Sequence, residues 1–119
     1  MLGFTKMKYR NKPTICNKMH KHASKKEAAR CDELTLLERA GKIEKLMQQP
    51  EFELQPKFKI ECKTIRPIKY RADFSYYDKE ENAFIVEDVK GFKTKDYMIK
   101  KKILLYIMRY REDWFFRET

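Results

Sequence analysis

The sequence predicts an α/β domain in which a small mixed β-sheet is flanked by helices. Two segments, at about 24–41 and 94–110, combine helix caps with apolar residues at helical spacing. Between and after them, apolar and polar residues alternate as they do in half-buried strands. A chain of 119 residues fits one domain, because a second core would leave each half marginal. We therefore expect a single domain over residues 24–119, preceded by a basic, partly ordered N-terminal arm over residues 1–23 that includes a short hairpin.

The two helices are expected from their end signals. Ser24 and Glu27 form a capping box, in which the serine hydroxyl accepts the Glu27 N–H and the glutamate returns to the serine amide. Gly41 accepts the left-handed conformation that ends a helix. Thr94 caps the second helix, which is expected to reach about Tyr110. Glu27 lies on or beside the apolar stripe of the first helix, so its carboxylate faces the core unless it serves only as a cap.

The strands are expected where apolar residues recur at every second position. These residues are Phe52 and Leu54; Phe58, Ile60 and Cys62; Ile68, Tyr70, Ala72, Phe74 and Tyr76. Residues 84–89 form the most apolar stretch and are expected at the centre of the sheet. A closing strand is expected at 114–116. The predicted order is helix, three or four strands, helix, strand.

The charge balance favours an anionic partner. The chain holds 28 Lys+Arg against 18 Asp+Glu, a net charge of +10 at pH 7. A field of that sign attracts the phosphate backbone of nucleic acid, although a solvated basic surface is the alternative. The lysines expected to bind nucleic acid lie at the start of each helix and along the second one: Lys25, Lys26, Lys93, Lys95, Lys100, Lys101 and Lys102.

The cysteines, the N-terminal sequence and the length of the apolar runs indicate the expected cellular compartment. Three cysteines without regular spacing, and a start unlike a signal peptide, favour a reducing cytoplasm. No apolar run approaches the roughly 18 residues needed to span a bilayer, so a membrane partner is not expected. Cys16, His20, His22 and Cys31 lack the paired short loops of a zinc site, so surface histidines and a buried cysteine are the simpler explanation.

Two aspartates and a lysine indicate a site for chemistry. Asp88 and Lys90 are two positions apart in a strand and therefore point to the same side of the sheet. Together with Asp73 they would form a cradle for Mg²⁺ or Mn²⁺, with the Val89 carbonyl and Glu27 completing the shell. Such a cation neutralises charge on a phosphodiester and lowers the pKa of an attacking water, while a lysine positions that water.

The register of the central strands leaves an ambiguity in this site. Pairing Tyr76 with Phe84 would place Glu87 opposite Asp73, whereas a shift of one residue selects Asp88. We expect Asp88, because it shares a face with Lys90. An ordinary surface salt bridge without a metal is the alternative.

Several short stretches resemble the PD-(D/E)xK nuclease superfamily, and more closely a family of short phage-borne proteins within it. They are Ser24–Lys25–Lys26–Glu27–Ala28, Gln48–Gln49–Pro50, Tyr70–Arg71–Ala72–Asp73–Phe74 and Val86–Glu87–Asp88–Val89–Lys90–Gly91, and the likeness runs from about Tyr9 onward. The resemblance implies a restriction-endonuclease-like core of order α-β-β-β-α-β. One departure is Ala72, which stands where the superfamily has a proline.

The resemblance also implies roles for individual residues. Glu27 would be the helix acid, Asp73 the hairpin acid, Asp88 the second metal acid and Lys90 the catalytic lysine, with Gln49 as a polar residue near the site. Similar small nucleases include dimeric resolvases of branched DNA such as Holliday junctions. The expected function is a Mg²⁺-dependent DNA endonuclease, selective for branched or recombining DNA, acting as a homodimer in the cytoplasm, that of the host cell if the chain is phage-encoded. The alternative is a non-catalytic DNA-binding accessory protein of recombination or replication.

Overall fold

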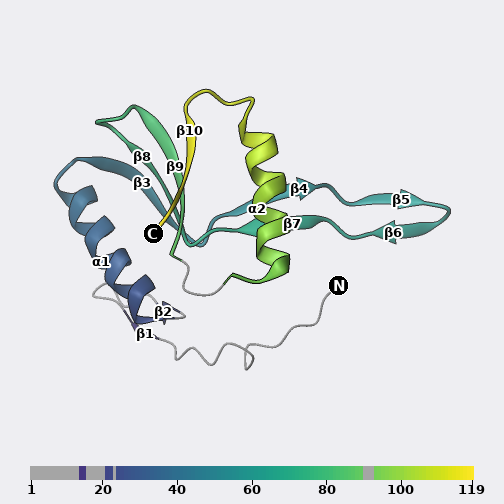
Figure 1. Ribbon diagram of the computed structural model, residues 1–119, viewed down its shortest axis with the longest axis horizontal. Coiled ribbons are helices and arrows are strands. Elements are labelled where there is room, and N and C mark those ends of the chain that lie inside the picture. The colour runs from purple at the N-terminus through teal and green to yellow at the C-terminus, as the bar shows by residue number, and fades with distance from the viewer. Residues whose placement is uncertain (1–13, 16–20, 23, 90–92) are drawn as a thin grey trace.

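The computed structural model describes residues 14–15, 21–22, 24–89 and 93–119, and it confirms the α/β class. Figure 1 shows a twisted sheet between two helices, with a long two-stranded ribbon extending away from the sheet. The helices are α1 (Lys25–Arg39) and α2 (Lys95–Met108). The strands are β1 (Thr14–Ile15), β2 (Lys21–His22), β3 (Ile43–Gln48), β4 (Glu51–Gln55), β5 (Phe58–Ile60), β6 (Lys63–Ile65), β7 (Ile68–Arg71), β8 (Phe74–Asp78), β9 (Ala83–Asp88) and β10 (Trp114–Glu118).

The helix ends follow the cap signals. Ser24 caps α1, and its hydroxyl accepts the Glu27 N–H at 3.2 Å. Gly41 follows that helix with a φ of 77°, in the left-handed region that glycine adopts without strain. Thr94 caps α2 in the same way and accepts the Tyr97 N–H at 3.0 Å. Neither helix, within the part of the chain that the structure describes, is long and apolar enough to cross a membrane.

The main sheet has four strands in the order β10-β9-β8-β3. Strand β8 pairs antiparallel with both β3 and β9, while β10 runs parallel to β9 after the crossover through α2. The expectation that residues 84–89 are central is confirmed, because β9 lies between β8 and β10. The hairpin expected in the N-terminal arm is formed by β1 and β2, and the rest of that arm lies outside the described residues.

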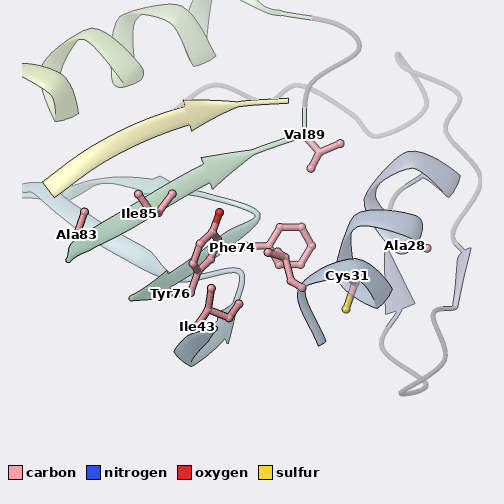
Figure 2. Close-up of a cluster of buried hydrophobic side chains, with 9 residues drawn as sticks. Ala28, Cys31, Ile43, Phe74, Tyr76, Ala83, Ile85 and Val89 are labelled. Carbon is pink, nitrogen blue, oxygen red and sulfur yellow. The ribbon is translucent and has the colours of Figure 1, made fainter. Parts of the chain in front are cut away.

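The two faces of the sheet are covered by different helices. Ile85 belongs to a buried cluster with Ala28, Cys31 and Leu34 of α1, and Figure 2 shows the strand side chains of this cluster facing that helix. The next residue, Val86, belongs to a second cluster with Leu104 and Met108 of α2. Because neighbouring strand residues point to opposite faces, α1 and α2 pack on opposite sides of β9. Cys31 is therefore a core residue, as expected.

Strand β3 was not expected from the sequence. Lys45 adopts a positive φ of 57°, and the pairing of β3 with β8 shifts between Glu44 and Met47. This bulge breaks the alternation of buried and exposed side chains by which a strand is identified. The expected long strand from Ile68 to Tyr76 is likewise interrupted at Ala72 and becomes two strands, β7 and β8, that pair with different partners.

The ribbon, which we define as residues 51–71, corrects another prediction. Phe58 and Ile60 were expected to be half buried, but they are 44% and 55% exposed. The ribbon is built from the pairs β4–β7 and β5–β6, and its far end extends beyond α2 (Figure 1). Alternation is present there, but within the described residues no helix covers the end formed by β5 and β6.

Candidate active site

The candidate site lies where the ribbon leaves the main sheet. At this junction the Gln49 N–H donates to the Asp73 carbonyl at 2.9 Å, and the Ala72 N–H donates to the Pro50 carbonyl at 3.0 Å. These two hydrogen bonds link the chain that enters the ribbon to the chain that leaves it, at the point where the ribbon meets the main sheet. Gln49 has a φ of 49°, a conformation that lets the chain bend here. Asp73 is thereby held at the first residue before β8 begins.

Asp73 and Asp88 are brought together at this junction. The Asp73 N–H donates to Asp88 Oδ1 at 3.0 Å, and the Val89 N–H donates to Asp73 Oδ2 at 2.7 Å. Asp73 is 9% exposed and Asp88 is fully buried. Each carboxylate is thus oriented by a backbone amide of the other strand. Two carboxylates buried side by side repel one another, and a cation or a proton between them relieves that repulsion.

Glu87 lies on the face of β9 opposite to Asp88, and its carboxylate accepts hydrogen bonds from other residues. The register pairs Phe74 with Glu87, so it is Asp88 that follows opposite Asp73. The buried Glu87 carboxylate accepts from Arg30 Nε, from Arg30 Nη2 at 3.0 Å and from the Tyr76 hydroxyl at 2.6 Å. Burial, followed by the hydrogen bond to Glu87, raises the pKa of Tyr76 to about 12. The ambiguity between the two acids is resolved in favour of Asp88 as the neighbour of Asp73.

A third carboxylate lies beside this pair on the α2 side. Glu118 pairs with Asp88 across β10 and β9, and it accepts from the Tyr97 hydroxyl at 2.6 Å. Two lysines approach it, with Nζ of Lys93 at 2.8 Å and Nζ of Lys101 at 3.4 Å. The hydrogen bond from Lys93, followed by that from Tyr97, lowers the pKa of Glu118 to about 2. The carboxylate is therefore charged at neutral pH.

Tyr97 joins the third carboxylate to the aspartate pair. Burial, the hydrogen bond to Glu118 and the negative charge of Asp88, Glu118 and Asp73 raise the pKa of the Tyr97 phenol. The phenol is a neutral donor close to three acids. The sequence pattern did not single out Glu118, because its position depends on the parallel pairing of β10 with β9. The one available signal was an acid that continues the period of two beyond Trp114 and Phe116.

Other expected site residues are placed as follows. Glu27 is 4% exposed at the start of α1, the helix that packs on the Ile85 face of β9. The structure does not bring it into one cluster with Asp73 and Asp88: in the described ranges, no group of three or more His, Cys, Asp or Glu side chains could hold a metal ion. Lys90 lies outside the described residues. Val89 contributes its amide to Asp73, and its side chain packs on the α1 side (Figure 2).

The expected nucleic-acid lysines divide into groups. Lys93 and Lys101 converge on Glu118, beside the aspartates. Lys100 pairs with Asp96 at 3.6 Å on the side of α2 that faces the ribbon. The remaining expected lysines are exposed: Lys25, Lys26, Lys95 and Lys102. The exposed side chain of Gln49 accepts from Arg71 at 3.4 Å, at the edge of the junction.

The donor set suits one kind of cation. Mg²⁺ usually binds through one or two carboxylates together with waters and substrate phosphates, rather than in a cage made only of protein ligands. Asp73 and Asp88 supply two neighbouring carboxylates of that kind. The adjacent lysines add positive charge, which suits a phosphate more than a second cation.

Comparison with known proteins places the chain in a family. Residues 6–118 match the family described as Protein of unknown function (DUF1064). No curated protein and no solved structure matches the chain significantly.

Proposed function

Since the chain belongs to the DUF1064 family, whose description gives no function, we propose from the site itself that the protein is a divalent-metal-dependent DNA endonuclease. The observation that carries the proposal is the buried contact between Asp73 and Asp88: the Asp88 carboxylate accepts from the Asp73 N–H, and the Asp73 carboxylate accepts from the Val89 N–H. Carboxylate pairs of this kind hold the metal in many phosphodiester hydrolases.

The roles of the residues follow from their placement. Asp73 and Asp88 would hold Mg²⁺ or Mn²⁺, and a bound cation lowers the pKa of a water and offsets charge on the phosphate. Lys93 and Lys101 lie beside the pair and would attract the phosphate backbone. Lys90, two residues after Asp88, is proposed as the lysine that orients the water. Glu27 is a candidate for an outer role, on the resemblance of its helix to that of the PD-(D/E)xK nucleases.

The net charge of +10 supports a nucleic-acid substrate. Selectivity for branched or recombining DNA would come from the shape of the substrate. A homodimer would suit the cutting of two strands.

The test is a cleavage assay on labelled four-way-junction, nicked, single-stranded and linear DNA, with Mg²⁺, with Mn²⁺ and with chelator. We expect metal-dependent cutting of at least one substrate by the wild type. Asp88→Asn and Lys90→Ala should abolish cutting while DNA binding is retained.

Asp113→Asn is the matched control, because Asp113 is an exposed acid at the other end of β9. It should cut like the wild type. If every substrate is bound but stays intact, the protein is instead a non-catalytic DNA-binding accessory protein, and the carboxylates serve only to fasten the junction of the strands.

A further inference from the structure

The far end of the ribbon, formed by β5 and β6, lies away from the proposed active site. Strands β5 and β6 pair Phe58 with Ile65 and Ile60 with Lys63 on one face, and Lys59 with Thr64 on the other, so the first face is apolar apart from Lys63. All three residues of β5 are exposed. No helix among the described residues covers this protruding end, so it can contact a large partner (Figure 1).

The charge of this end identifies the kind of partner. Five cations, Lys57, Lys59, Lys63, Arg66 and Lys69, stand against one acid, Glu61, over residues 57–69. Only Lys69 forms an ion pair within the described part of the chain, with Glu51 at 3.8 Å. A second copy of the same ribbon would bring like charges together, which disfavours self-association through this surface. A polyanion is favoured.

Basic residues continue from the ribbon to the second helix. A groove of about 490 Å³ separates them, with Arg66 and Lys69 on one side and Lys100 on the other. Its floor is apolar, formed by Ile65, Ile68, Ile99 and Ile103. Basic residues thus line the groove from the ribbon to α2, where Lys100 pairs with Asp96.

We propose that the β5–β6 end of the ribbon is a second contact surface for duplex DNA, in which Lys57, Lys59, Lys63 and Arg66 engage phosphates away from the Asp73–Asp88 pair. Two-stranded ribbons fit the major groove of B-DNA, and apolar side chains such as Phe58 can contact thymine methyl groups there. The inference builds on the proposed function for the nature of the substrate, but it concerns binding and not cleavage.

The reach of the ribbon sets the expected position of the contact. About ten residues of strand separate Lys63 from Asp73, which at about 3.3 Å each span at most about 33 Å. At about 3.4 Å per base pair, this corresponds to about ten base pairs. The ribbon should therefore contact DNA no more than about one helical turn from the phosphate at the aspartate pair.

The test compares two triple variants of the full chain with equal loss of charge. Lys57→Gln/Lys59→Gln/Lys63→Gln removes cations from the ribbon, and Lys42→Gln/Lys45→Gln/Lys79→Gln removes exposed lysines from the far end of the main sheet. Binding to a fluorescent duplex of about 30 base pairs is measured in chelator between about 50 and 200 mM salt. The plot of log K against log salt has a negative slope, and its magnitude should be smaller in the ribbon variant by up to about 2.7, at about 0.9 per phosphate contact.

The control variant should keep the wild-type slope. Equal slopes for all three proteins, or a wild type that binds no duplex, would overturn the proposal. So would loss of binding that coincides with conversion of a dimer to a monomer, measured by light scattering. A ribbon variant with a lower slope in a protein that cuts nothing would support the ribbon contact and refute only the nuclease.

Discussion

Replacing Arg30 with Met would leave the Glu87 carboxylate buried without its cationic partner. Glu87 has no exposed surface, and Arg30 donates to it through Nε and Nη2. Among the described residues, the two remaining donors are the Tyr76 hydroxyl at 2.6 Å and the Thr119 hydroxyl at 3.2 Å. Neither of them carries a positive charge, so neither offsets the cost of a charged group held away from water.

The expected loss is large for a domain of this size. Removing one partner of a buried ion pair costs about 3–5 kcal/mol. Domains are stabilised by about 5–15 kcal/mol in total, so Arg30→Met is expected to be folded but close to its limit. The Glu87→Gln variant should lose less, about 1–3 kcal/mol, because Arg30 is 20% exposed and can turn its charge to solvent.

Urea unfolding of the wild type, the two single variants and the double variant Arg30→Met/Glu87→Gln measures these differences. The double variant should be less destabilised than the sum of the single ones, because it leaves no uncompensated charge. A loss below about 1 kcal/mol for Arg30→Met, the value of a surface pair, would refute the assignment of Arg30 and Glu87 as a buried ion pair.

Three further changes test other parts of the structure. The pKa of Tyr76 is raised from 10.0 to about 12, so its stabilising contribution is present below pH 10 and is lost as the pH rises toward 12. Urea unfolding at alkaline pH should therefore show a steeper loss for the wild type than for Tyr76→Phe, and parallel curves would contradict this. The pKa of Glu118 is lowered from 4.5 to about 2, so its contribution is present above pH 4.5 and is lost as the pH falls through about 2. Glu118→Gln should be less stable by about 1–2 kcal/mol at pH 7 but flatter in acid, and equal acid unfolding would count against the Lys93 and Tyr97 contacts. Leu34 is fully buried, so Leu34→Ala should cost about 2–5 kcal/mol in thermal unfolding, whereas Leu36→Ala, at an exposed position, should cost less than about 1 kcal/mol.

The helices could be predicted because their signals are local. Ser24 and Thr94 each cap the helix that the sequence indicated, and Gly41 follows the end of the first one. Strand β3 was missed because it has no such local signal. Its regular alternation is interrupted by a bulge near Lys45, and only its pairing with β8 makes it a strand.

Alternation predicted the strands of the ribbon but not their exposure. The period of two at Phe58 and Ile60 shows that one face is apolar, and it does not show whether another element covers that face. Coverage depends on where α2 crosses the ribbon, and the helix packs against β4 and β7 but leaves β5 and β6 uncovered.

Part of the candidate site could be predicted from the sequence. The convergence of Asp73 and Asp88 follows from two neighbouring strands and a choice of register, and the structure has that register. The partnership of Glu87 with Arg30 and the position of Glu118 beside Asp88 depend on tertiary packing. Neither contact could be predicted from the spacing of residues along the chain.

Metal binding at the aspartate pair can be measured by isothermal titration calorimetry with Mn²⁺ and Mg²⁺ in the absence of DNA. We expect one site in the wild type and in Asp113→Asn, and its loss in Asp73→Asn and Asp88→Asn when circular dichroism shows that these variants are folded. A wild type that binds neither ion at millimolar concentrations, or folded aspartate variants that bind as the wild type does, would contradict it.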